Sequence, residues 1–273
     1  FFCFAASYAS IDFFWRLMAY LALFHFVKQQ FGFMALYAVK NGSRKQISYK
    51  WDKYLIFFSM LYPVLYWHLH DDLNFSWFVA NDFVLNHWLH IPNLVFIITN
   101  TLYWLLIGFW FIQKVRLGKK RFLEQLPMIL WILTTAFNWY LGIVYFNSDL
   151  AFTATNVVAH GIPYLVLIIF YKKKKEEVVT QKRNGYFKVG IIVVAVCLFF
   201  GIAEEYLWDV LVNHEKKELY SSFLYYFDWT TENRMLKALF VALLSVPQVT
   251  HYVLDGYIWK NNDSNPFLSK VFT

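Results

Sequence analysis

The chain has 273 residues, of which 59% are hydrophobic, with 30 Phe, 19 Tyr and 12 Trp, and its mean hydropathy is +0.40. One soluble core of this length could not bury so much apolar surface, so a single water-soluble domain is excluded and a lipid bilayer is the expected partner. The net charge of +7 does not indicate a nucleic-acid partner, because Lys and Arg fall in short clusters between apolar runs of spanning length. Cys3 and Cys197 lie apart in apolar stretches, which favours neither a disulfide framework nor a zinc–thiolate site.

Apolar runs of roughly 17 to 25 residues are long enough to cross a bilayer as helices. About seven runs of this kind are present, and the sequence therefore predicts an all-α, polytopic integral membrane helix bundle that forms a single transmembrane domain over residues 1–273. The opening FFCFAASYAS is typical of the end of an apolar helix, so we expect residues before Phe1. The predicted spans are 13–39, 54–69, 92–113, 127–146, 153–171, 187–203 and 235–259.

The segments between these spans alternate in charge. Residues 40–53, 114–121, 172–188 and the tail from 260 are basic, whereas 70–90, 147–152 and 204–232 are acidic or nearly neutral. The positive-inside rule then predicts cytoplasmic basic loops and a cytoplasmic C-terminus. We expect a bacterial inner membrane.

Polar residues inside three of the spans are the first functional candidates, because imidazole and carboxylate groups are costly to place in hydrocarbon. His25, His160 and His251 each have a polar residue one helical turn later, at Gln29, Tyr164 and Asp255, so each pair shares a helix face. Asn156 lies one turn before His160, and Pro163 and Pro247 are expected to bend the axis beside His160 and His251.

Depth along the helices allows the three imidazoles to meet. They lie 15, 12 and 9 residues before the cytoplasmic Lys40, Lys172 and Lys260, or about 22, 18 and 14 Å at the rise of an α-helix. Helix tilt of about 20° can absorb this spread. One shared site is therefore geometrically allowed.

Three imidazoles and one carboxylate, without a thiolate, form a typical ligand set for non-haem iron. The sequence thus predicts a metal site made by His25, His160, His251 and Asp255, with Gln29, Asn156 and Tyr164 orienting the imidazoles. Zinc, manganese, copper and haem stay open as alternatives to iron. The competing interpretation is that each His only hydrogen-bonds a neighbouring helix and stabilises helix packing.

The sequence V-P-Q-V-T-H-Y-V-L-D-G-Y-I-W-K, with His251 and Asp255, resembles the last motif of the Brp/Blh family of bacterial integral-membrane β-carotene dioxygenases. The H-F at His25 and the A-H-G at His160 resemble that family's intramembrane histidine motifs. The resemblance implies a multi-span, iron-dependent enzyme that cleaves carotene to retinal. The family's early H-G-x-x-D motif is absent, and its V-P-H is V-P-Q here. The phrases H-F-V-K-Q-Q-F-G-F and H-Y-V-L-D-G-Y-I-W-K also resemble uncharacterised bacterial membrane proteins.

Two functions remain open at this level. In the first, the chain is a membrane oxygenase or related redox enzyme that acts on a hydrophobic small molecule such as a carotenoid or lipid. In the second, it is a non-catalytic membrane subunit that binds a membrane protein partner, or a transporter. A further set of histidines, at the outer interface, has spacing compatible with a surface metal but is better explained as an interfacial loop: His68, His70, His87 and His90.

Overall fold

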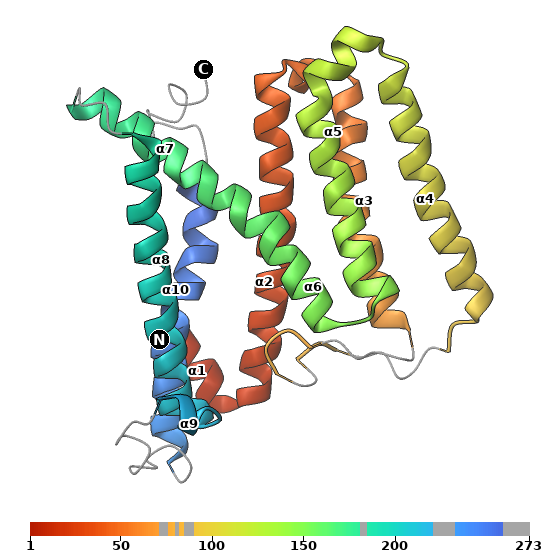
Figure 1. Ribbon diagram of the computed structural model, residues 1–273. Coiled ribbons are helices and arrows are strands. Elements are labelled where there is room, and N and C mark those ends of the chain that lie inside the picture. The colour runs from red at the N-terminus through yellow and green to blue at the C-terminus, as the bar shows by residue number, and fades with distance from the viewer. Residues whose placement is uncertain (71–75, 80–81, 85–89, 181–184, 221–232, 259–273) are drawn as a thin grey trace. The chain divides into compact units, whose positions relative to one another are not determined.

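A computed structural model describes residues 1–70, 76–79, 82–84, 90–180, 185–220 and 233–258 of the chain. These residues form helices and no strand, which confirms the all-α class (Figure 1). Long apolar runs with few Gly residues satisfy their backbone polar groups within each segment, as a bilayer requires.

Five helical segments of the described chain are long and apolar enough to cross a membrane, so the protein is an integral membrane protein. The other two predicted spans are also helical, in α2 (Ile11–Lys40) and α3 (Ser48–Leu69), but do not belong to this set. The count of about seven spans stays a prediction. The qualifying segments are Asn93–Val115, Lys119–Tyr145, Asp149–Glu177, Tyr186–Asn213 and Arg234–Asp255.

The chain divides into two compact units, and both boundaries fall inside continuous helices. Unit 1 comprises residues 1–18 and 165–273, and unit 2 comprises residues 19–164. Because no linker separates the units, this division does not decide whether they are separate domains, and a single transmembrane domain stays a prediction.

Unit 2 is built around α3, α4 (Asn93–Val115) and α5 (Lys119–Trp139), which contact one another (Figure 1). The second part of α2 belongs to this unit and is preceded in the chain by the part that belongs to unit 1. A short 3-10 turn, η1 (Ser43–Lys45), joins α2 to α3. Large side chains such as Trp67, Tyr103 and Trp139 are fully buried in this unit.

The last part of unit 2 departs from regular α-helix twice. The chain continues from α5 into the π-helical segment η2 (Tyr140–Tyr145), then α6 (Asp149–Asn156), the π-helical segment η3 (Val157–Gly161) and the start of α7 (Ile162–Thr180). Pro163 has no N–H to donate to the carbonyl of Ala159, which interrupts the α-helical ladder next to η3. π-helical turns are frequent at functional sites.

Unit 1 contains α1 (Phe2–Ala9), α8 (Tyr186–Trp208), η4 (Asp209–Asn213), α9 (Lys217–Tyr220) and α10 (Arg234–Ile258). α1 lies against α10, where the Ser7 hydroxyl donates to the carbonyl of Ala238 over 3.0 Å and Arg234 donates to the carbonyl of Tyr8 over 2.7 Å. These bonds join segments that are more than 200 positions apart in the chain.

Two helices extend beyond the predicted ends of their spans and include buried charged residues. The sequence predicts that Lys114 opens a basic loop, yet α4 continues to Val115 and Lys114 is buried. The predicted loop 40–53 likewise contains the first turn of α3 and the buried Asp52. Lys114 and Asp52 are buried together as an ion pair of 2.7 Å, which explains why hydropathy alone places them outside the helices.

Candidate metal centre

The first candidate ligand, His25, is buried near the middle of α2. Gln29 follows one turn later on the same face, as the spacing predicts. Neighbouring Gln30 contacts α5. Its Oε1 accepts a hydrogen bond of 2.9 Å from Thr135, and its main-chain oxygen accepts one of 3.0 Å from Trp131. These bonds join α2 to α5 beside the candidate site.

The second candidate, His160, is buried in η3, and its ring lies beside that of His25. The two ring centroids are 6.4 Å apart, with the ring planes at 76°. Two imidazoles that share one ion, with metal–nitrogen bonds of about 2.1 Å, place their centroids at most about 6.6 Å apart. The observed 6.4 Å lies close to this limit, which only a nearly linear arrangement of the two nitrogens about the ion reaches, so a tetrahedral or octahedral ion would require the two rings to move closer together.

A series of aromatic contacts in unit 2 begins at this pair. Phe26 lies against the His160 ring at 4.6 Å and stacks on Trp77 at 5.2 Å. Trp77 contacts Phe152 at 5.6 Å, and Phe152 contacts Trp139 at 5.3 Å. These rings provide apolar surface on one side of His160, which suits a lipid-soluble ligand.

Of the predicted orienting residues, Asn156 is buried at the end of α6, where its Oδ1 accepts a long hydrogen bond of 3.5 Å from Asn138 of α5. Asn138 is not predicted from the sequence as a site residue, because it lies on another helix with no motif around it. Tyr164 lies on α7 one turn after His160 and is half-buried.

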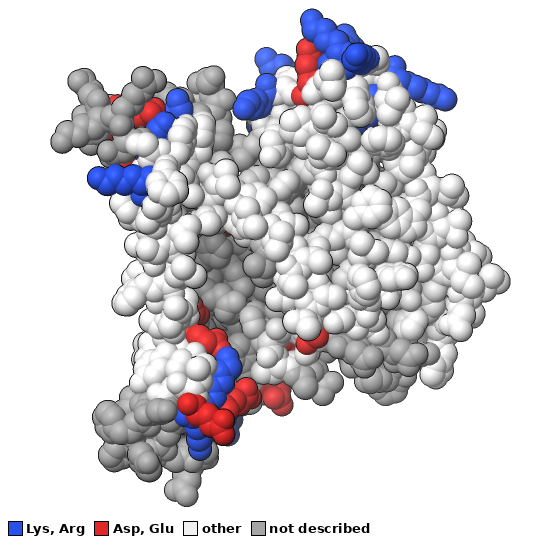
Figure 2. Space-filling view, viewed as in Figure 1, with Lys and Arg blue, Asp and Glu red and all other residues white. Residues whose placement is uncertain are grey.

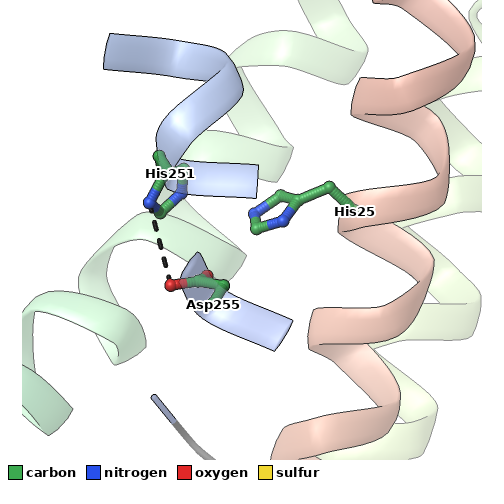
Figure 3. Close-up of side chains that lie close together, drawn as sticks. All are labelled: His25, His251 and Asp255. Atoms are coloured by element: carbon green, nitrogen blue, oxygen red, sulfur yellow. Dashed lines mark ion pairs between the residues drawn. The ribbon is translucent and has the colours of Figure 1, made fainter. Parts of the chain in front are cut away.

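His251 and Asp255 form a second pair, on α10 of unit 1. Nδ1 of His251 and Oδ1 of Asp255 are 3.7 Å apart, and the two residues are one helical turn from each other. The dashed line in Figure 3 marks this pair; His25 in that view belongs to α2. The His251 side chain is 44% exposed, whereas that of Asp255 is 9% exposed. Pro247 lies inside α10 one turn before His251. Thus the candidates are distributed as two pairs, one in each unit, and a single centre holding all of them stays a prediction.

The outer histidines have other roles where the structure describes them. His68 Nε2 and the Tyr20 hydroxyl form a hydrogen bond of 2.9 Å, and His68 Nδ1 is 2.7 Å from the carbonyl of Val64. His70 stacks on Tyr66 at 5.0 Å. His90 is exposed, and His87 lies outside the described residues. His68 lies in α3 and not in a loop, and both of its ring nitrogens take part in hydrogen bonds, which argues against a surface metal at His68.

No protein-family model, curated protein or solved structure matches the chain. The arguments for its function therefore come from the two histidine pairs and their surroundings.

Proposed function

We propose that the protein is a membrane-embedded, metal-dependent oxygenase or related redox enzyme that acts on a hydrophobic substrate such as a carotenoid or lipid. The observation that carries the proposal is the His25–His160 pair: two buried imidazoles with centroids 6.4 Å apart inside one compact unit. Imidazole ligands without a thiolate favour non-haem iron over softer metals. Open coordination positions on such an ion would admit dioxygen and substrate.

The aromatic side chains around the pair support a lipid-soluble substrate. Phe26 and Trp77 provide an apolar surface next to His160, and apolar pockets with few polar groups are typical of small-molecule sites. The chain's own part in the reaction would be to position the imidazoles and to keep water away from the reacting atoms.

Iron content of the purified protein tests this function. We expect near-stoichiometric iron in the wild type and a loss of most of it in His25→Ala and in His160→Ala, because each substitution removes a ligand. The exposed His90 is the matched control, and His90→Ala should keep its iron. A metal-free wild type would contradict the proposal and favour a non-catalytic membrane subunit or a transporter.

Substitutions on α10 test whether the second pair takes part in the same centre. We expect His251→Ala to abolish metal binding. Asp255→Asn should spare much of the metal if the carboxylate only orients His251, and should lower occupancy if it is a ligand, since an amide is a weaker ligand than a carboxylate. If His251→Ala keeps its full iron content, His251 and Asp255 are not part of the site, and the His25–His160 pair supplies its protein ligands.

We further propose that the basic ends of the helices face the cytoplasm of a bacterial cell, with the chain in the inner membrane. In unit 2, exposed Lys and Arg gather where α2 ends, α3 begins and α4 turns into α5 (Figure 2). By the positive-inside rule this end would be cytoplasmic. The residues are Lys40, Arg44, Lys45, Lys50, Lys53, Arg116, Lys119, Lys120 and Arg121.

A further inference from the structure

Gln29 differs from its neighbour Gln30 in a way that points to a ligand. The Gln30 side chain is hydrogen-bonded to Thr135 of α5. In contrast, both polar atoms of the Gln29 amide, Nε2 and Oε1, are shielded from solvent and have no hydrogen-bond partner among the residues that the structure describes. Exchanging the amide's nitrogen and oxygen would not change this, because neither position has a partner.

A buried amide without hydrogen bonds lowers the stability of the fold. A buried polar group without a hydrogen bond destabilises a protein, and a helix within hydrocarbon has no solvent that could supply one. Gln29 lies 11 residues before Lys40, which is about 16 Å from the basic end of α2 at the rise of an α-helix. Gln29 is therefore deep in the expected span.

The position of Gln29 links it to the candidate site. It lies one turn from His25 on the same face of α2. Gln30, in contrast, accepts hydrogen bonds from Thr135 and Trp131 of α5. Gln29 therefore lies on the face of α2 that carries His25, whereas Gln30 lies on the face that contacts α5.

We propose that the Gln29 amide binds the hydroxyl group of an apolar ligand, such as a long-chain alcohol. The amide offers N–H donors and a carbonyl acceptor, and a hydroxyl both accepts and donates, so one hydroxyl can satisfy both sides of the amide. A charged headgroup would be costly at this depth, and an ester or ketone could only accept. That the bound alcohol is the substrate rests on the proposed function; its binding to Gln29 does not.

The test compares the thermal unfolding of the purified protein in lipid nanodiscs with 1-dodecanol and with dodecane, which lacks the hydroxyl. At a tenfold excess over its dissociation constant, a specific ligand should raise the apparent Tm of a chain of this size by about 3 °C. Any general effect of the alcohol on the bilayer is cancelled by measuring the same difference in Gln29→Leu.

We expect the alcohol–alkane difference in the wild type, its loss in Gln29→Leu and its retention in Gln30→Leu. Without ligand, Gln29→Leu should keep or raise the Tm, because it removes an unsatisfied amide, whereas Gln30→Leu should lower the Tm, because it removes bonds to α5. Two results would overturn the proposal: an equal response of Gln29→Leu and the wild type to the alcohol, which would leave water as the amide's partner, or a Tm of Gln29→Leu as low as that of Gln30→Leu.

Repeating the measurement after treatment with a metal chelator separates this proposal from the metal proposal. A dodecanol shift that persists in metal-free protein and depends on Gln29 supports the hydroxyl site even where iron analysis is negative. Loss of the dependence on Gln29 in protein with full iron overturns the hydroxyl site and leaves the metal centre in place.

Discussion

Lys114 and Asp52 form a buried ion pair in unit 2, and each has further partners. Lys114 Nζ lies 2.7 Å from Asp52 Oδ1 and 3.1 Å from Gln125 Oε1, and Trp110 donates to the same Asp52 oxygen over 2.7 Å. The cluster joins α3, α4 and α5 at one end of the unit. Because every charge in the cluster has a partner, burial is tolerated here, and the cluster fixes how these helices meet.

Lys114→Met should lower the free energy of unfolding by about 3–5 kcal/mol, because it leaves the Asp52 carboxylate buried without its counter-charge. Chemical denaturation in detergent measures the change. The double variant Asp52→Leu with Lys114→Met should recover most of the loss, since both buried charges are then absent. Exposed Lys119 supplies the control, and Lys119→Met should change stability by less than about 0.5 kcal/mol. If the single and double variants were equally unstable, the loss would come from changed packing and not from an unpaired charge.

At the scale of elements, the close approach of η2 and α6 positions the end of unit 2. A Cβ added at Gly142 would lie 2.8 Å from the Cα of Phe152, so only glycine permits this contact. Phe152 is almost fully buried between Trp77 and Trp139, and α6 leads directly into η3, which carries His160. Gly142 in η2 therefore helps to determine the position of the His160 ring.

Gly142→Ala should force α6 away from η2 and destabilise the protein by about 1–3 kcal/mol, the usual cost of overpacking. The thermal midpoint measures this effect, and metal content should fall with it if His160 is a ligand. Gly108 in α4 has open space where an added methyl group would lie, so Gly108→Ala should be neutral or stabilising by up to about 1 kcal/mol. Equal stability of the two variants would show that η2 and α6 can separate at no cost.

On the scale of the whole molecule, the distribution of charge suits insertion in a bilayer. Apart from Lys28 within α2, the exposed Lys and Arg of unit 2 lie at one end of its helices. Exposed Asp149 follows the opposite end of the helical segment that α5 and η2 form. In unit 1, Lys216 and Glu205 form an ion pair close to the end of α8. The segments between these ends are apolar enough to face lipid.

Cysteine labelling tests the resulting topology. With Cys3 and Cys197 replaced by Ala, single cysteines at Lys119 and Asp149 should be labelled by a membrane-impermeant reagent from opposite sides of sealed vesicles, because α5 and η2 together are long and apolar enough to cross the bilayer once. Glu215→Cys should share the side of Asp149→Cys, and Lys174→Cys that of Lys119→Cys. Labelling of positions 119 and 149 from the same side would show that the predicted topology is wrong.

The class of the protein follows from the sequence alone, because long apolar runs with internally bonded backbones have few alternatives to membrane helices. The sequence also predicts which polar residues lie inside the spans, including His25, His160 and Gln29, since helical periodicity and the cost of polar groups in lipid are local properties. These predictions need no knowledge of which helices are neighbours.

Contacts between distant segments required the tertiary structure. The approach of His25 to His160, the ion pair of Asp52 with Lys114 and the different environments of Gln29 and Gln30 all depend on helix adjacency and on which face of a helix meets its neighbour. The three π-helical segments η2, η3 and η4 could not be predicted either, because a change in hydrogen-bond register leaves no periodic signal in a short stretch. Periodicity determines the face on which a side chain lies, whereas packing decides what that side chain meets.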